Sequence, residues 1–207
     1  MNTELSKPNW LRVTAAGIAA ITLLGLVIRL VLAAQLHNGF LNGASHLYQF
    51  FTIVTNTLVL VVFSYVFFQR SINPRWILTS VVSIVGVGLI FHFMLDAPPN
   101  TEFFDWLANI LTHSVVPIAC FIWWLAYGSV YNLHISAALW ALVWPLAYCA
   151  YALIRAEFSG FYPYPFIDLE RLGFAGLVKS VGFISCIFLT ISLVSYFSPI
   201  LLRKLGR

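Results

Sequence analysis

One histidine stands inside a run of apolar residues, where polar side chains are rare. It is His113, which lies about two helical turns into the segment DWLANILTHSVVPIACFIWWLAY. Threonine hydroxyls occur at a similar depth in another apolar run, FFTIVTN at residues 50–56, where Thr52 and Thr55 are the candidates. A threonine is a weak nucleophile until a neighbouring base removes its proton, and a neutral imidazole can act as that base. These residue types therefore predict nucleophilic chemistry at a carbonyl carbon if the fold brings them together.

Polar residues accompany both candidates at helical spacing. They form two stripes: Tyr48, Thr52, Thr55 and Asn56 at i, i+4, i+7 and i+8, and Asp105, Asn109 and His113 at intervals of four. A polar stripe that faced lipid would be costly, so we expect both stripes to point into a helix bundle and to face each other. Each residue alone also has a structural explanation, because threonine hydroxyls bond back to the i−4 carbonyl and polar side chains bridge membrane helices.

The elements that must position these stripes are long apolar helices. Of the 207 residues, 61% are hydrophobic and 9% are charged, and the mean hydropathy is +0.91. Six apolar segments approach the length that a helix needs to cross a bilayer: residues 13–34, 46–68, 76–95, 107–127, 134–154 and 174–200. The sequence has no internal repeat. We predict an all-α polytopic membrane protein in which residues 1–207 form a single domain of six transmembrane helices.

Lysine and arginine are distributed unevenly between the two sides of this topology. If the N-terminus is cytoplasmic, the inner side carries more of them than the outer side: Lys7, Arg12, Arg70, Arg75, Arg203, Lys204 and Arg207 inside, and Arg155, Arg171 and Lys179 outside. Positive residues favour the cytoplasmic side, so we predict that both termini are cytoplasmic. The first segment is not expected to be a cleaved signal peptide, because its apolar region is too long and contains Arg29.

The depth of each polar residue can be compared between helices at about 1.5 Å per residue. Arg29, Thr52, His92 and His113, from four different helices, then share one level in the outer third of the membrane. Ionisable residues at such depth usually face a cavity or a partner. Arg29 has the alternative of reaching outward to lipid headgroups. We expect the set to line a polar cavity near the outer face.

Several classes of site lack support in the sequence. No GxSxG, HExxH, GxxxxGK[ST] or GxGxxG motif occurs, which argues against serine-elbow esterases, zincins and nucleotide-binding enzymes. The three cysteines show no CxxC spacing, and His92 and His113 lack the spacing of metal ligands. The net charge of +4 comes without a basic cluster dense enough for nucleic acid. We therefore expect no metal, no cofactor and no nucleic-acid partner, and leave the oligomeric state open.

The connection between the fifth and sixth segments is rich in proline and aromatic residues. Its sequence is SGFYPYPFIDLERLGF, residues 159–174, and it includes Tyr162, Tyr164 and Asp168. Proline restricts the backbone, and tyrosine combines an apolar ring with a polar tip, which suits an ordered segment at the membrane interface. We expect this loop to cap the cavity, with Tyr162, Tyr164 and Asp168 as candidates for supporting the site or contacting a substrate.

The YPYPFID motif in this loop resembles the signature of the androgen-induced membrane hydrolase family and its bacterial relatives. Three further segments agree in order, so that the likeness covers nearly the whole chain: FFTIVTN at 50–56, LTHSVVP at 111–117 and WPLAYCAYALIR at 144–155. Members of that family are six-span proteins. Its characterised eukaryotic members hydrolyse fatty acid esters of hydroxy fatty acids with a threonine and a histidine inside the membrane.

The resemblance implies a lipid hydrolase of the bacterial type, in a bacterial inner membrane, with Thr52 as nucleophile and His113 as base. Its substrate would be a lipid taken from the bilayer. Thr55 offers a second hydroxyl one turn away, and the donor to the developing oxyanion is open among Asn56, Arg29 and His92. The same cavity would also suit a lipid or small-molecule transporter, or a scaffold in which polar residues only join helices.

Overall fold

The computed structural model describes residues 9–95 and 102–205, and all of the regular secondary structure within these ranges is helical. The elements follow one another as α1 (Asn9–Leu36), α2 (Phe40–Leu47), α3 (Phe51–Phe67), α4 (Pro74–Met94), α5 (Phe103–Ile110), a π turn η1 (Leu111–Val115), α6 (Val116–Tyr127), a 3-10 turn η2 (Gly128–Tyr131), α7 (Ser136–Trp140), α8 (Val143–Ser159), a 3-10 turn η3 (Pro165–Ile167) and α9 (Leu169–Leu205).

Most of the predicted spans are present as long apolar helices. Among the described residues, five segments are long and apolar enough to cross a membrane: Asn9–Leu36, Pro74–Met94, Phe103–Tyr131, Ser136–Ser159 and Leu169–Leu205. Counting α2 and α3 together as one bent span gives six. The protein is therefore an all-α, multi-pass membrane protein by the length and composition of its helices.

The predicted span 46–68 is wrong as a continuous helix. The chain bends by 99° between α2 and α3 at residues 48–50, which we call the break. Tyr48 lies in the break and not on α3, so the first polar stripe begins at Thr52. The Tyr48 hydroxyl lies 3.2 Å from the Thr57 Oγ1 on the exposed side of the helix.

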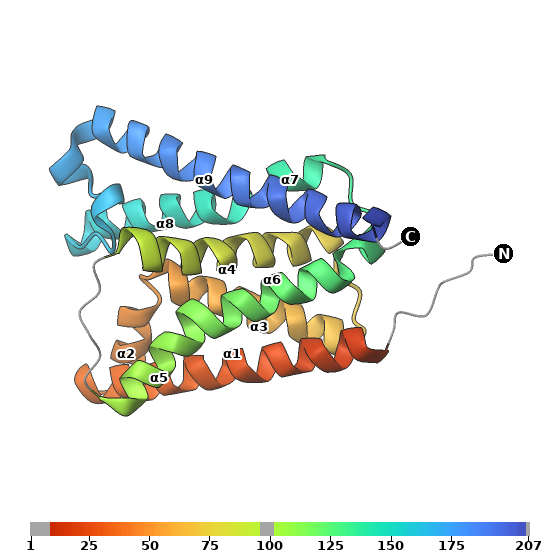
Figure 1. Ribbon diagram of the computed structural model, residues 1–207. Helices are drawn as coiled ribbons and strands as arrows, with labels where there is room; N and C mark the ends of the chain where they lie inside the picture. The colour runs from red at the N-terminus through yellow and green to blue at the C-terminus, as the bar shows by residue number, and fades with distance from the viewer. Residues whose placement is uncertain (1–8, 96–101, 206–207) are drawn as a thin grey trace.

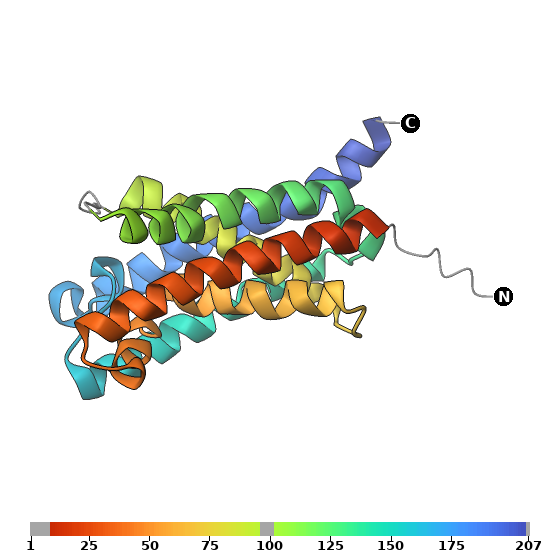
Figure 2. The same cartoon turned by 90° about the horizontal axis from the view of Figure 1, so that it is seen from below.

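The helices pack side by side, with α4 in the middle of the bundle (Figure 1). In the most apolar 18-residue stretch of α4, 67% of the residues are buried. In the corresponding stretch of α9, only 22% are buried. Both views show that α1 begins and α9 ends at the same end of the bundle, while α2 and the loop before α9 lie at the opposite end (Figures 1 and 2). Lys7 and Arg207, used to predict the orientation, lie outside the described residues.

The core and the outer surface are both apolar. Large side chains from four helices fill the interior: Phe63 of α3, Leu78 and Ile84 of α4, Trp123 and Trp124 of α6 and Phe188 of α9. Many other large apolar side chains are exposed on the outside of the bundle, among them Leu24, Ile122, Phe183 and Val194. A soluble protein rarely exposes so much contiguous apolar surface, which fits a bundle surrounded by lipid.

Candidate active site

The break places Thr52 in the first turn of a helix. Phe50 has an extended backbone, with φ −97° and ψ 134°, and provides no side-chain cap for α3. The helix begins at Phe51, so Thr52 is its second residue and not, as the sequence predicted, about six residues into a span. The first backbone N–H groups of a helix have no intrahelical partner and carry partial positive charge. In α3 the Phe51 N–H donates to Tyr164 and the Ile53 N–H to the Phe50 carbonyl, so what the helix start offers the Thr52 hydroxyl is its partial positive charge.

Side chains of α8 hold the backbone of the break. The Tyr148 hydroxyl donates to the carbonyl oxygen of Gln49 at 2.6 Å, and the Tyr151 hydroxyl donates to that of Tyr48 at 3.1 Å. A buried carbonyl without a partner would cost free energy comparable to a lost hydrogen bond. These two tyrosines replace the bonds that an uninterrupted helix would have supplied, and they tie the start of α3 to α8.

A tyrosine of the aromatic loop reaches the same place. The Phe51 N–H donates to the Tyr164 hydroxyl oxygen at 3.0 Å. Burial raises the pKa of the Tyr164 phenol, against smaller opposing contributions from its hydrogen bonds with Thr52 and Phe51. The phenol therefore keeps its proton at neutral pH, and that proton remains available to an acceptor next to Thr52.

Thr52 and His113 form a hydrogen-bonded pair across 61 residues of sequence, with 3.2 Å between Thr52 Oγ1 and His113 Nε2. The other ring nitrogen, Nδ1, lies 3.1 Å from the carbonyl oxygen of Asn109. A carbonyl can only accept, so we infer that Nδ1 carries the proton of the neutral ring. Nε2 is then free to accept from the Thr52 hydroxyl, which is the tautomer that a general base needs.

His113 lies in the π turn that joins α5 to α6. The turn ends just before Pro117, which has no N–H to donate to the carbonyl of His113. A Cβ atom on Gly88 would lie 3.1 Å from that same carbonyl oxygen, so the glycine lets α4 pass close to the turn. A π turn widens the helix by one residue and recurs at functional sites.

The π turn also brings Thr112 to its neighbour's ring, a contact that sequence spacing could not predict. Thr112 Oγ1 lies 3.1 Å from His113 Nδ1 and donates to the carbonyl of Ala108 at 2.8 Å. Its oxygen can therefore accept from Nδ1 together with the Asn109 carbonyl. The group that orients His113, which could not be assigned from the sequence, is thus supplied by its own helix.

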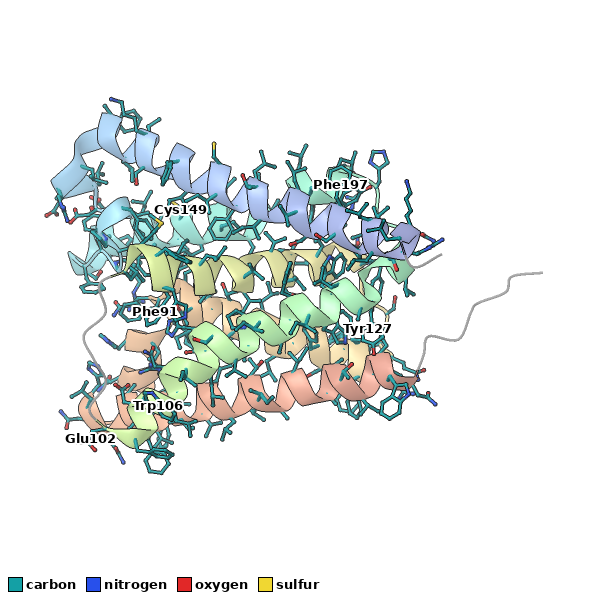
Figure 3. The ribbon with its side chains drawn as sticks, viewed as in Figure 1. Phe91, Glu102, Trp106, Tyr127, Cys149 and Phe197 are labelled. Carbon is teal, nitrogen blue, oxygen red and sulfur yellow. The ribbon has the colours of Figure 1, made fainter. Side chains whose placement is uncertain are left out.

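Phe91 of α4 covers the face of the His113 ring. The two ring centroids are 3.9 Å apart and the planes are inclined by 23°. Figure 3 shows Phe91 toward the end of the bundle that holds α2. Packing of this kind restricts rotation of the imidazole, so the ring is held by a stacked aromatic as well as by hydrogen bonds. The sequence contains too many phenylalanines for this one to have been singled out.

Arg29 contacts the second polar stripe and does not reach outward alone. Its guanidinium group contacts Asp105 at 2.5 Å and the side-chain oxygen of Asn109 at 3.1 Å. Asp105 thus pairs with Arg29. The ion pair joins α1 to α5, and it holds the helix whose carbonyl orients the histidine.

The other two members of the first stripe have partners of their own. The Asn56 amide nitrogen donates to the carbonyls of Thr52 at 2.8 Å and Thr112 at 3.4 Å, which bridges α3 to η1. The buried hydroxyl of Thr55 accepts from Trp144 Nε1 at 3.2 Å. His113 is therefore bonded to Thr52 and not to Thr55, and the N–H groups of Asn56 point to backbone carbonyls.

Three predicted site residues lie away from the pair. His92 Nε2 is 2.9 Å from the Ser114 hydroxyl on an exposed surface. Asp168 accepts from the Arg171 N–H at 2.9 Å in the first turn of α9, where it acts as a helix cap. Tyr162 lines neither of the two pockets next to Thr52. The depth comparison could not give the direction of the His92 side chain.

Two pockets of different character meet at the pair. The narrow pocket, of about 60 Å³, is apolar and lies between α4, α8 and α9, with Val87, Leu146 and Phe188 in its wall. The wide pocket, of about 560 Å³, includes Arg29, His37, His46 and His113. Both are lined by Thr52, Phe91, Leu95 and Tyr164, so the Thr52 hydroxyl stands at their junction.

No group of three or more histidine, cysteine or acidic side chains that could hold a metal ion occurs among residues 9–95 and 102–205. Cys120, Cys149 and Cys186 are free thiols. Comparisons of the chain with protein-family models, with curated proteins and with solved structures found no match.

Proposed function

We propose that the protein is an intramembrane lipid ester hydrolase in which Thr52 is the nucleophile and His113 the general base. The observation that carries the proposal is the 3.2 Å contact between Thr52 Oγ1 and His113 Nε2, with Nδ1 of the same ring bonded to the Asn109 carbonyl. A hydroxyl, a base and a group that orients the base are the three parts of an activated nucleophile.

In the proposed first step, His113 Nε2 accepts the proton of Thr52 while Oγ1 attacks the carbonyl carbon of an ester. The carbonyl electrons move to oxygen and form a tetrahedral oxyanion. As the oxyanion collapses, the bond to the alcohol oxygen breaks and His113 returns the proton to that oxygen. The acyl group is then an ester of Thr52. Water, deprotonated by His113, attacks this ester, releases the free acid and restores both residues.

The oxyanion in this scheme is stabilised by Tyr164 and by the start of α3. The Tyr164 hydroxyl accepts from Phe51, so its own proton can be donated to the substrate oxygen. The partial positive charge at the N-terminus of α3 acts at the same point. The donors first considered, Asn56, Arg29 and His92, have other partners in the structure.

The two pockets support a substrate with two distinct parts. The narrow pocket, of about 60 Å³, suits a short part of the acyl chain next to the ester, because its wall is apolar, and the wide pocket suits the alcohol part, because it contains basic residues. A fatty acid ester of a hydroxy fatty acid has both parts. Such a lipid would enter from the bilayer, since apolar side chains surround the bundle.

The proposed location is the inner membrane of a bacterium, with both termini in the cytoplasm. Among the described residues, Arg12, Arg203 and Lys204 belong to the beginning of α1 and the end of α9, which share one end of the bundle (Figure 1). The positive-inside rule makes that end cytoplasmic. The Thr52–His113 pair then lies toward the outer leaflet.

A second candidate function is transport or binding of a lipid or small molecule. The volume of the wide pocket, about 560 Å³, favours it, because this is within the range of ordinary ligand sites. In that case Arg29 would matter more than Thr52. The two functions differ in whether an ester bond is broken.

The test is hydrolysis of a fatty acid ester of a hydroxy fatty acid by the purified protein in detergent. We expect product from the parent and a loss of at least about 1000-fold in Thr52→Ala and His113→Ala. Thr52→Ser keeps a hydroxyl and should retain part of the turnover. Thr55→Ala is the matched control, because Thr55 lies one turn away and is bonded to Trp144.

Each outcome has a defined meaning. Full turnover in His113→Ala contradicts the mechanism. If turnover is lost in Thr55→Ala and preserved in Thr52→Ala, the nucleophile is Thr55 and not Thr52. A folded parent that binds the lipid without releasing product favours the binding or transport function.

A further inference from the structure

Two histidines stack at the far end of the wide pocket. His37 follows the end of α1 and His46 belongs to the last turn of α2, and their ring centroids lie 4.1 Å apart with planes inclined by 29°. Both line the wide pocket. The catalytic scheme uses neither of them.

Close packing of α2 on α1 creates this arrangement. A Cβ atom on Gly43 would lie 2.6 Å from the backbone nitrogen of Ala34, a distance that no side chain could tolerate. The glycine thus lets the two backbones touch. Because His46 lies one turn beyond Gly43, the contact brings its ring against that of His37.

The hydrogen bonds of the two rings leave nitrogen atoms for a ligand. The Gln49 amide nitrogen is 3.0 Å from His46 Nδ1, so Nδ1 accepts and we infer that the proton of His46 is on Nε2. Nε2 of His37 is buried and has no hydrogen-bond partner within residues 9–95 and 102–205. A buried polar atom of this kind is costly unless something binds it.

The surroundings of the pair are basic. Arg155 of α8 donates to the carbonyl of Ser45 at 2.9 Å, and its buried Nε has no partner in the described part of the chain. Among the described residues that line the wide pocket, the one acid is Asp105, which pairs with Arg29.

We propose that His37 and His46 bind the anionic end, a carboxylate or phosphate monoester, of a single-chain amphiphile whose hydrocarbon chain lies in the wide pocket. Imidazole N–H groups donate to such oxygens, most strongly when a ring is protonated. Leu32, Leu36 and Phe50 supply apolar wall for the chain. The proposal concerns binding alone, so it does not depend on whether the protein hydrolyses an ester.

The test is photolabelling by a fatty acid that carries a diazirine in its chain and a terminal alkyne, with the full-length protein in a non-ionic detergent. We expect His37→Ala and His46→Ala each to reduce labelling about tenfold. The matched control is His134→Ala, because His134 precedes α7 at the other end of the bundle (Figure 1). This variant should label like the parent.

Ligand chemistry is tested in the same assay. The fatty alcohol with the same diazirine chain should label about tenfold less than the acid. An excess of a lysophosphatidate should compete, and inorganic phosphate should not. Equal labelling by acid and alcohol overturns the anion site, and full competition by inorganic phosphate overturns the requirement for a chain.

Folding is controlled by a second variant. His37→Gln keeps an N–H donor near the position of Nε2 and should recover part of the labelling lost in His37→Ala. Parent-like labelling in both alanine variants overturns the proposal. So does an equal loss in His134→Ala, because a remote histidine would then matter as much as the pair.

Discussion

Helices α3 and α4 are neighbours in sequence and in the bundle, yet they begin in different ways. The start of α4 is fixed by adjacent residues, since Asn73 accepts from the Arg75 N–H at 3.0 Å and Pro74 occupies the first turn. The start of α3 has no side-chain cap of its own. Its backbone is held by tyrosines roughly a hundred residues away in sequence, with separations of 99, 103 and 113 residues.

This difference shows that the helix at the centre of the bundle and the helix that carries Thr52 are positioned in different ways. The start of α4 is defined by its own sequence, and the helix provides the buried centre of the fold. The start of α3 exists only when α8 and the aromatic loop are in place. Because the Phe51 N–H and the Gln49 and Tyr48 carbonyls are bonded by that assembly, the position of Thr52 depends on the folded bundle.

Among the changes that test the two helix starts, the largest expected effect is on turnover in Tyr164→Phe. This change removes the acceptor of the Phe51 N–H and the proton proposed to reach the oxyanion, so kcat should fall about 100-fold. Steady-state hydrolysis of the lipid ester measures it. Tyr162→Phe in the same loop is the control, because Tyr162 lines neither pocket. A kcat for Tyr164→Phe close to that of the parent would remove Tyr164 from the mechanism.

Tyr148→Phe should have the next largest effect, on stability. The phenol is 8% exposed, and its loss leaves the Gln49 carbonyl without a donor, which should lower the free energy of unfolding by about 2 kcal/mol. Denaturant unfolding of the protein in detergent gives this value. A change within experimental error would mean that the break does not depend on α8.

Asn73→Ala tests the other side of the comparison. Loss of the cap on α4 should lower the free energy of unfolding by about 1 kcal/mol. The same denaturant experiment applies, and turnover per folded molecule should equal that of the parent. A marked loss of kcat in this variant would show that local capping of α4 also sets the geometry of Thr52.

The smallest effect is expected for Tyr151→Phe. This phenol also donates to the break, to the Tyr48 carbonyl, but it is 39% exposed. Water or a lipid headgroup can replace it, so the free energy of unfolding should fall by no more than about 0.5 kcal/mol. A loss as large as that of Tyr148→Phe would mean that exposure does not distinguish the two tyrosines.

The same contrast explains what the sequence could predict. The bounds of α4 were predicted within two residues, 76–95 against Pro74–Met94, because the signals for a membrane helix are local. The break was missed because the segment LYQF at 47–50 contains neither glycine nor proline, and its hydrogen-bond partners are distant in sequence. Helix continuity there is decided by tertiary contacts.

The candidate site was predicted in part. Depth and polar spacing paired Thr52 with His113, and the two side chains do lie within hydrogen-bond distance. The depth comparison did not give the direction of the His92 side chain. Neither depth nor spacing indicated the contact of Thr112 with His113 or the stacking of His37 on His46. Those contacts depend on a π turn and on a close helix crossing, and neither follows from residue periodicity.

The π turn at Leu111–Val115 has a consequence for insertions and deletions. A π turn differs from an α turn by one added residue, and each residue of an α-helix rotates its face by about 100°. Deleting Val115 would return the segment to an ordinary helix and swing either His113 or the whole of α6 away from its present partner. Loss of a single codon in this turn would therefore leave a bundle that still crosses the membrane but in which His113 no longer contacts Thr52.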